Sequence, residues 1–467
     1  MILGQRQKAL EINLNPKIYG SFAEIGAGQE VARHFFRAGG AAGTIAKSIS
    51  AYDMTMSDVL YGKENSKRYV CEDRLQKMLD TEYQSLINCL ENVRSKDTTF
   101  FAFADTVSAK SFKGTGENHG WVGIKFQQIA NQQPSQVILH ISMLDAENTQ
   151  QQEAIGVLGV NLIYAVYHDT HDRELFIEGL MDGLSNSRIK IDMIRVSGEA
   201  FQNVDSKLLC LELVKKKLCE AIIFDEEGEV LQASDVLYKK NVLVLRGAYR
   251  PPTLLSVDML ETGLRNFKKS LSNEEKENVI VIPEISMSLL LDRGKVDNED
   301  FLARVELLSA LGQKVLISNF QSNSDLNLFF TKYAKKKVAF VLATYNLERM
   351  LRHIKQEDAP FGLIGTLGTL FGPNTKLYIY PSFDDEKNLI KNLENLEIDS
   401  SVRFLLNYLI QNNSIEWLND FNPKVIKIWS RKVLKMIQND ETGWENYVPN
   451  SVSLTVKNKC LFGAKCI

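Results

Sequence analysis

The polar residues that end the predicted strands in the second half of the chain are the main candidates for chemistry. In a parallel α/β sheet the carboxyl ends of the strands share one edge, where loops and helix N-termini converge and ligands bind. Reading that edge from the sequence gives Asp225, Arg246, Glu284, Asn319, Thr344 and Ser382. Carboxylates, an arginine and an amide on one edge are typical of a site for a polar small molecule. The alternative is that these residues only mark where the strands reach solvent.

Arginine indicates which ligand this edge would bind. Arg250 follows Arg246 by one short turn, and Pro251 and Pro252 restrict the backbone that carries it. A guanidinium matches the geometry of a carboxylate or a phosphate group. We therefore expect a small anionic metabolite as the ligand. The predicted substrate-binding residues are Arg246, Arg250, Asn319 and Thr344.

Acid–base chemistry would come from the carboxylates and from one histidine. A carboxylate at the strand edge is suited to act as a general base or a metal ligand. His119 precedes a predicted strand after a glycine-rich turn, where catalytic groups often stand on loops, and histidine titrates near neutral pH. A histidine in a surface turn is the alternative. The predicted catalytic residues are Glu284, Asp225 and His119.

Two other polar groups interrupt apolar segments of the first half. Asp105 lies in an apolar predicted strand, and a carboxylate is costly to bury unless it is paired or hydrogen-bonded. It marks either the point where the strand leaves the core or a residue held in a site. The run HDTHD at 168–172 carries ligand-type side chains, but it lies between two predicted helices, where capping explains polar residues. No metal site is predicted.

A glycine-rich segment at 24–48 resembles a phosphate-binding loop at first sight. The dinucleotide-binding pattern fails because Val31 stands at its third glycine, and the P-loop pattern fails because Ala41 and Ala46 stand at its two glycines. A backbone anion nest stays open, with tight turns and close helix contacts as the alternative. The candidate cofactor-binding positions are Gly26, Gly28, Gly40 and Gly43. The pattern identifies no cofactor.

Charge and composition exclude several classes of protein. The 467 residues carry 55 lysines and arginines against 58 aspartates and glutamates, a net charge of −3. This balance argues against binding of nucleic acid or of an anionic membrane by bulk charge. The hydrophobic fraction of 44% is that of a globular protein and not of a disordered one.

Apolar runs and cysteines indicate the compartment. The longest apolar run, 154–167, is shorter than the roughly 18 to 20 residues that cross a bilayer, and residues 1–20 lack the apolar stretch of a signal peptide. We expect a cytoplasmic protein without a membrane segment. The six cysteines include no CxxC pair, so reduced thiols are expected, although Cys460 and Cys466 are close enough in sequence to chelate or cross-link.

The periodicity of the chain changes near residue 189. Before it, apolar residues spaced by three and four predict helices at 71–94 and 148–167, and strand-like runs near 99, 121 and 136 predict an antiparallel meander. After it, apolar strands alternate with amphipathic helices, which is the pattern of a parallel sheet with flanking helices. The predicted fold is therefore α/β, with an α+β region at 1–188, a parallel-sheet domain at 189–395 and a helical region with a tail at 396–467.

Several segments together resemble an uncharacterised bacterial family of similar length. They are the runs at 22–55, FADTV at 103–107, HGWVGIKFQ at 119–127, 150–165 and ALGQKVLISNF at 310–320. Members of that family carry inconsistent labels, including nicotinate-nucleotide adenylyltransferase and TonB-dependent receptor. The chain contains neither the GxxxPxHxGH-type loop nor the SxTxxR motif of such adenylyltransferases, and its βαβ order is unlike the membrane strands of a receptor. The resemblance implies a cytosolic bacterial protein and supplies no site residue.

The predicted function is that of a cytoplasmic enzyme or binding protein for a small anionic metabolite. The alternative is a non-catalytic assembly protein, in which the meander and the terminal helices form a homo-oligomer and the glycines serve packing. Short lysine runs at 215–217 and 335–337 lie at predicted helix ends, where lysines interact favourably with the helix dipole. Nucleic acid is therefore not predicted as a partner.

Overall fold

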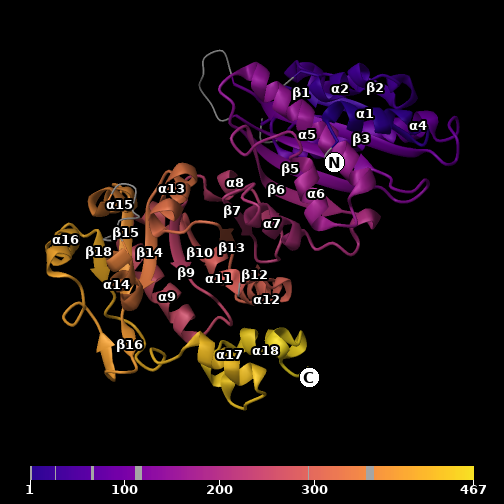
Figure 1. The fold of residues 1–467 in the computed structure, drawn as a ribbon. Helices are drawn as coiled ribbons and strands as arrows, with labels where there is room; N and C mark the ends of the chain where they lie inside the picture. Colours follow the sequence, from indigo (N-terminus) through magenta and orange to yellow (C-terminus); the bar gives the residue numbers. More distant parts are fainter. Residues whose placement is uncertain are drawn as a thin grey trace. The chain divides into compact units, whose positions relative to one another are not determined.

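The computed structural model describes residues 3–26, 28–64, 68–110, 118–292, 294–353 and 362–466. The chain forms two compact units, unit 1 (Met1–Cys219) and unit 2 (Glu220–Ile467), each with its own large β-sheet (Figure 1). Both units combine helices with a sheet, which confirms the α/β class.

Unit 1 is built on a six-stranded mixed sheet. In order across the sheet, the strands are β2 (Ile45–Ile49), β1 (Ile18–Ile25), β3 (Thr99–Ser108), β4 (His119–Phe126), β5 (Ser135–Met143) and β6 (Ile189–Ser197). β1 pairs in parallel with β2 and β3, whereas β3, β4, β5 and β6 pair antiparallel in succession. The glycine-rich segment therefore connects the parallel strands at one side of this sheet.

Helices cover both faces of the unit 1 sheet. They are α1 (Gln5–Leu14), α2 (Glu30–Ala38), α3 (Met54–Tyr61), α4 (Glu72–Leu90), α5 (Asn148–His168), α6 (Arg173–Leu180) and α7 (Ser206–Lys215). α4 packs on β1, β3 and β4, while α1, α2 and α5 pack on one another. α5 approaches closely because Gly159 has no side chain: a Cβ there would lie 2.4 Å from Val31 of α2 and 3.0 Å from Phe103 of β3.

β6 belongs to the sheet of unit 1, whereas the sequence analysis placed it in the second domain. Its residues pair with β5, from Ile189 opposite Met143 to Ser197 opposite Gln136. The sequence analysis grouped β6 with the later strands because its alternating pattern is like theirs. Periodicity reports which faces of a strand are buried, but not which sheet the strand joins. The division between the two compact units falls after Cys219.

Unit 2 is built on an eight-stranded sheet. In order, the strands are β18 (Ile415–Trp417), β15 (Thr375–Tyr380), β14 (Val338–Ala343), β9 (Asn241–Arg246), β10 (Val279–Ser286), β13 (Val315–Ser318), β7 (Ala221–Phe224) and β8 (Val230–Leu231). The six strands from β18 to β13 are parallel, and β7 and β8 extend the sheet by antiparallel pairing. Because β18 is one edge of this sheet, the segment after residue 396 contributes to it.

The order of the parallel strands reverses beside β9. The chain adds β10 and β13 on one side of β9 and then crosses to the other side for β14, β15 and β18. The loops after β9 and β14 therefore lead away in opposite directions. In doubly wound α/β sheets, ligands bind outside the carboxyl ends of the two strands at such a reversal.

Helices also cover both faces of the unit 2 sheet. They are α8 (Ala233–Leu237), α9 (Leu254–Lys269), α10 (Asn273–Glu277), α11 (Met287–Leu290), α12 (Asn298–Ser309), α13 (Asn323–Ala334), α14 (Thr344–His353), α15 (Gly362–Leu370) and α16 (Ser400–Gln411). Val242 and Val244 of β9 face a core formed with α8, α13, α14, α15 and α16. Leu243 points to the opposite face, where it lies near α9. Two small hairpins, β11–β12 (Leu291–Asp292, Lys295–Val296) and β16–β17 (Ser382–Asp384, Leu389–Lys391), complete the strands.

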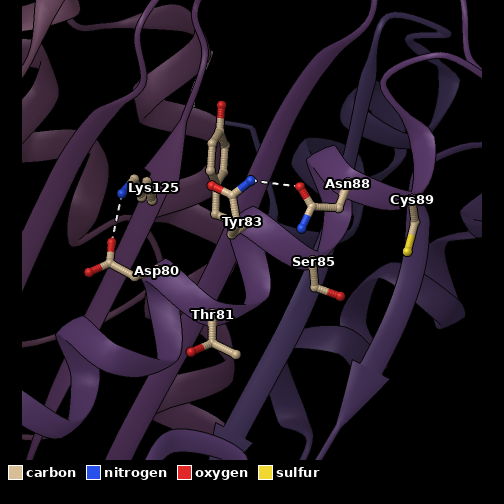
Figure 2. Close-up of a pocket in the computed structure, with 8 residues that line it drawn as sticks. Asp80, Thr81, Tyr83, Ser85, Asn88, Cys89 and Lys125 are labelled. Atoms are coloured by element: carbon tan, nitrogen blue, oxygen red, sulfur yellow. Dashed lines mark hydrogen bonds and ion pairs between the residues drawn. The ribbon is translucent and has the colours of Figure 1, made fainter.

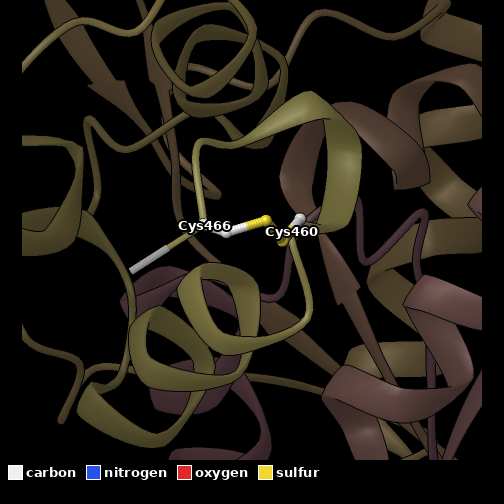
Figure 3. Close-up of a disulfide and its surroundings, with 2 residues drawn as sticks. All are labelled: Cys460 and Cys466. Carbon is white, nitrogen blue, oxygen red and sulfur yellow. A yellow bond between two sulfur atoms is a disulfide. The ribbon is translucent and has the colours of Figure 1, made fainter.

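The last segment of unit 2 contains a disulfide. α17 (Ser430–Gln438) and α18 (Asn450–Asn458) form a small apolar cluster with Leu307 of α12. After α18, a turn brings Cys460 and Cys466 within 4.9 Å between Cα atoms, and the two side chains are bonded (Figure 3). The prediction of reduced thiols is therefore wrong for this pair. The thiols of the structure are those of Cys71, Cys89, Cys210 and Cys219.

Candidate functional site

The carboxyl edge of the unit 2 sheet contains a buried ion pair between two predicted site residues. Arg246 ends β9 and is opposite Glu284 of β10 in the strand register. Its Nε donates to Oε2 of Glu284 (2.6 Å) and its Nη2 donates to Oε1 (3.1 Å). The guanidinium also donates to the carbonyl oxygens of Phe320 and Gln321. Arg246 therefore uses most of its five N–H groups within the protein.

Glu284 is fully buried and links three strands. It accepts from Arg246 of β9 and from the hydroxyl of Ser318 of β13. Burial raises the pKa of Glu284, and both Arg246 and the Ser318 hydroxyl oppose that rise. Since a buried charge is strongly destabilising without its partner, Glu284 depends on Arg246 at this edge of the sheet. The role of Glu284 as a general base stays a prediction.

Arg250, in the loop between β9 and α9, belongs to an arginine cluster that it forms with two residues of α12. Its Nε contacts one oxygen of Asp300 in α12, and Nη2 of Arg304 contacts the other oxygen. Arg304 also donates to the carbonyls of Ala248 (3.2 Å) and Leu289 (2.8 Å), which ties the loop to α12. Arg304 and Asp300 are buried, whereas the side chain of Arg250 is 29% exposed.

The arginine cluster, defined as Arg250, Asp300 and Arg304, carries a net positive charge. Two guanidiniums share one carboxylate. Burial lowers the pKa of Arg304, but arginine titrates so far above neutral pH that it keeps its proton. The next carboxylate, Asp297, is exposed and accepts from the backbone amides of Glu299 and Asp300 as the cap of α12. Among the described residues, the printed ion pairs of the cluster thus join two guanidiniums to one carboxylate, and Arg250 is the partly exposed member.

The other predicted binding residues lie at strand ends and differ in exposure. Asn319 follows β13 and is half-buried, and its backbone amide donates to the carbonyl of Glu220. Thr344 follows β14, is fully buried and donates its hydroxyl to the carbonyl of Tyr380 (3.1 Å). Ser382 is buried at the start of β16. The side chain of Asn319 is thus better placed for a ligand than that of Thr344, and both roles stay predictions.

Asp225 lies away from this edge. It follows β7, which runs antiparallel to β13, with Phe224 opposite Val315 at the start of β13. Its carboxylate accepts from the amides of Glu227 and Glu229 in a turn. The expectation that Asp225 shares an edge with Glu284 is therefore wrong, because it assumed that all the strands of this half are parallel.

The four predicted cofactor-binding glycines lie in the connections on either side of α2. Gly26 and Gly28 lie between β1 and α2, and Gly40 and Gly43 lie between α2 and β2. Gly26 has a φ of +104°, and a Cβ there would lie 2.0 Å from the carbonyl oxygen of Val107 in β3. Glycine is required at this position because the backbone of β3 is so close.

Glu24 occupies the N-terminus of α2 that a bound anion would need. Its Oε1 accepts from the amide of Val31 (2.9 Å) and its Oε2 accepts from the amide of Ala32 (3.1 Å). An anion nest at this helix would therefore have to displace a carboxylate of the same chain. The cofactor-binding role of Gly26, Gly28, Gly40 and Gly43 stays a prediction.

Glu24 also forms a buried acid pair with Asp105 that the sequence analysis missed. The two residues are opposite each other in the register of β1 and β3, and both are buried. Burial raises the pKa of Glu24 to about 7, and burial together with Glu24 raises the pKa of Asp105 well above its ordinary value. Asp105 Oδ1 accepts from the amide of Ile25 (3.2 Å). The apolar surroundings of Asp105 were the available signal, but nothing local indicated its partner.

His119 is the first residue of β4 and not part of a loop. It is half-buried, and its Nδ1 lies 3.0 Å from Nε2 of His140 in β5. The sequence analysis assigned no role to His140, because a single histidine inside an apolar strand carries no periodic signal. The catalytic role of His119 stays a prediction.

Two surface hollows lie in unit 1, away from the predicted site residues. One, of about 850 Å³, follows the exposed side of α4, where Lys125 pairs with Asp80 and Gln84 donates to Asn88; Cys89 lies at its far end (Figure 2). The other, of about 900 Å³, lies beside the start of α6 and is lined by residues that include His171. Both are open hollows with a mixed polar and apolar lining, and ligand sites are usually more enclosed and more apolar.

Metal-binding clusters and membrane-spanning helices are both absent from the described residues. Across those residues, no group of three or more histidine, cysteine, aspartate or glutamate side chains is arranged to hold a metal ion. Within the same ranges, every helix is too short or too polar for a bilayer span.

Solved structures are similar to part of the chain. The competence/damage inducible protein CihA from Agrobacterium tumefaciens matches with 16% identity and a TM-score of 0.26, over 35% of this chain and 97% of its own. The competence damage-inducible protein A from Klebsiella pneumoniae matches with 12% identity and a TM-score of 0.26, over 35% and 96%. A putative nicotinate-nucleotide adenylyltransferase from Vibrio parahaemolyticus matches with 12% identity and a TM-score of 0.23, over 48% and 95%. Neither a protein-family model nor a curated protein matches the chain.

Proposed function

We propose that this protein binds a small anionic metabolite at the carboxyl edge of the unit 2 sheet, in the loop between β9 and α9. The observation that carries the proposal is the arginine cluster, in which Arg250 and Arg304 share the carboxylate of Asp300. A planar guanidinium with donors to spare binds carboxylate and phosphate groups well. The cluster is anchored by buried groups, so Arg250 needs little reorganisation to receive an anion.

The position of the cluster in the fold supports the same ligand class. The loop that carries Arg250 leaves β9, the strand beside which the strand order reverses, and ligands of such sheets bind at that point. Arg246 and Glu284 neutralise each other and position the strand ends. In this proposal Arg250 is the main anion ligand, and Asn319 is a second polar group on the same edge. Cytoplasmic location and a homo-oligomer belong to the same proposal as predictions.

Arg250→Ala tests the proposal because it leaves the buried pair between Asp300 and Arg304 in place. Thermal unfolding is measured with inorganic phosphate, pyrophosphate, citrate and ADP at increasing concentration. At least one of these anions should stabilise the wild type, by about 2.7 kcal/mol at one hundred times its dissociation constant. The stabilisation should be lost in Arg250→Ala.

Arg265→Ala is the matched control. Arg265 is half-exposed and pairs with the exposed Asp420, so its removal deletes a surface arginine outside the cluster. This variant should respond to the anion as the wild type does. A wild type that responds to none of the four anions, or an equal response of both variants, would contradict the proposal.

A further inference from the structure

A disulfide loop in unit 2 encloses the short 3₁₀ turn η4 (Leu461–Gly463). Cys460 precedes the turn and Cys466 follows it, and the bond between them closes a loop with a sequence separation of six residues (Figure 3). Cys466 is exposed and Cys460 is half-buried. A thiol in solution therefore has access to the bond from the side of Cys466.

Apolar residues of this loop cover the apolar cluster formed by α17, α18 and α12. Leu461, Phe462 and Ala464 pack against that cluster, and Leu307 is its residue from α12. η4 accordingly contacts all three helices. The position of the loop therefore affects how α12 and α17 pack.

The backbone of the loop adopts a conformation that few residues other than glycine favour. Cys460 has a φ of +54° and Phe462 has a φ of +57°. A Cβ makes this left-handed region unfavourable, so such residues persist only where the surrounding structure holds them there. The disulfide supplies such a restraint because it joins the two ends of the turn.

Two ion pairs also attach the loop, but they are weak. Lys459 pairs with Glu306 of α12, and Lys465 pairs with Asp440. All four side chains are exposed, and ion pairs between exposed groups contribute little to stability because water and salt screen them. In the part of the chain that the structure describes, the disulfide and the apolar contacts are therefore the main restraints on the loop.

The helices beneath the loop are the ones that hold Arg250. In α17, the hydroxyl of Ser430 donates to the carbonyl oxygens of Arg250 (2.8 Å) and Pro251 (3.1 Å). In α12, the carboxylate of Asp300 contacts the guanidinium of Arg250, and Leu307 of the same helix belongs to the apolar cluster. Both the backbone and the side chain of Arg250 are therefore positioned by helices that η4 contacts.

We propose that the disulfide is a redox-sensitive clasp on unit 2. When the bond is closed, η4 stays packed on α12 and α17, and these helices hold Arg250 in place. When the bond is reduced, η4 leaves the cluster and the loop between β9 and α9 gains freedom, so an anion must order that loop in order to bind. The effect on anion binding rests on the proposed function, whereas the release of η4 does not.

A low-molecular-weight thiol, glutathione, is the co-reactant. Its thiolate attacks Sγ of Cys466, the S–S bond breaks, and Cys460 leaves as a thiolate that takes up a proton. A second glutathione thiolate attacks the mixed disulfide on Cys466 and releases the second protein thiolate, which is protonated in turn, together with glutathione disulfide. Two electrons thus pass from two glutathione molecules to the protein, and glutathione disulfide reverses both steps.

Hydrogen exchange of the full chain tests the clasp without any ligand. The protein oxidised by glutathione disulfide is compared with the protein reduced by excess glutathione, and alkylation of Cys460 and Cys466 followed by mass spectrometry verifies each state. Backbone amides in η4, in α17 and at the end of α12 should exchange about tenfold faster after reduction. Amides of β14, in the core of the same unit, should exchange at the same rate in both states.

Two double variants separate this bond from the other cysteines. Cys460→Ser with Cys466→Ser should exchange as fast as the reduced wild type and should not respond to glutathione. Cys71→Ser with Cys89→Ser is the matched control, because it removes two thiols of unit 1 and keeps the disulfide, so it should respond as the wild type does. A bond that glutathione leaves intact, or equal exchange in the oxidised and reduced wild type, would overturn the clasp.

Calorimetric titration with inorganic phosphate, pyrophosphate, citrate and ADP tests the link to Arg250. It compares the oxidised wild type with the Cys460→Ser, Cys466→Ser variant. At least one anion should bind the oxidised wild type about tenfold more tightly. Equal dissociation constants would overturn the link between the clasp and Arg250. Faster exchange after reduction, with no anion bound by either protein, would support the release of η4 and contradict the proposed anion site.

Discussion

Glu24 and Asp105 are carboxylates that lie opposite each other in two neighbouring parallel strands, and both are buried. The structure favours a proton on this pair, because two adjacent carboxylates in an apolar core repel when both are ionised. Glu24 nevertheless accepts from two backbone amides of α2, which stabilises its ionised form. These opposing effects bring the pKa of Glu24 to about 7, a range in which small changes of pH alter its charge.

The stability of unit 1 should fall as pH rises from about 5 to 8. A carboxyl group whose pKa is higher in the folded state binds its proton more tightly when folded, so it contributes stability below its ordinary pKa of 4.5 and loses it as pH rises through about 7. The free energy of unfolding should fall by about 2 to 3 kcal/mol over this range. Urea unfolding at several pH values measures this slope, and Glu24→Gln should reduce it.

Glu91→Gln is the control for the pH dependence. Glu91 is exposed at the end of α4, so its replacement leaves the buried pair intact and should keep the wild-type slope. A slope in Glu24→Gln as steep as that of the wild type would show that Glu24 is not the titrating group.

Packing between elements depends on glycines at close helix–sheet contacts. α9 crosses the unit 2 sheet near the reversal of strand order, and a Cβ on Gly263 would lie 2.4 Å from Cγ2 of Val341 in β14. Valine is branched at Cβ and has few alternative rotamers in a packed strand, so it cannot move aside easily. The position of α9, and with it the loop that carries Arg250, therefore depends on Gly263.

Gly263→Ala should destabilise unit 2 by about 1 to 3 kcal/mol through overpacking. Gly368→Ala is the matched comparison, because Gly368 is in α15 and a Cβ there meets no atom within 4 Å. This variant should leave stability unchanged or raise it by up to about 1 kcal/mol, since alanine favours a helix over glycine. The urea concentration at the midpoint of unfolding, compared between variants with the same dependence of unfolding free energy on urea, measures both changes in stability. Equal effects of the two substitutions on stability would mean that the contact between Gly263 of α9 and Val341 of β14 has room for a methyl group.

At the scale of the whole molecule, the two units have separate sheets and separate cores. All strands of the first sheet lie before residue 219, and all strands of the second lie after it. A unit that buries its own core and pairs its own strands can fold alone. β6 is the strand that decides where the boundary between the units must fall.

Fragments 1–219 and 220–467 should each unfold in one cooperative transition when expressed separately. A fragment ending at residue 188 should not, because it lacks β6 and exposes the apolar edge of β5. Far-UV circular dichroism and urea unfolding of the three fragments check this. Cooperative unfolding of the 1–188 fragment would support the boundary expected from sequence over the structural one.

The local pattern of apolar and polar residues predicted most of the helices and strands in unit 2. The alternation of apolar strands and helices expected after residue 189 is seen in β9, β10, β13, β14 and β15, which are separated by helices. Apolar runs separated by amphipathic helices carry this information because burial of a face imposes a period on the residues themselves. For the same reason, placing Arg246 and Glu284 at one sheet edge needed only the expectation that these strands are parallel.

Other features depended on contacts between distant residues. Two examples are the direction of β7 and the sheet that β6 joins. Others are the ion pairs of Arg246 with Glu284 and of Arg250 with Asp300, and the hydrogen-bonded contacts that link His119, His140 and Asp192. Asp192 lies 73 positions after His119, and a bulge is needed to bring the two into one network. Residue types and their spacing thus determine which segments become strands and helices and which residues can carry charge. The tertiary structure alone decides which charges neutralise one another, because a partner is chosen by distance in space and leaves no period in the chain.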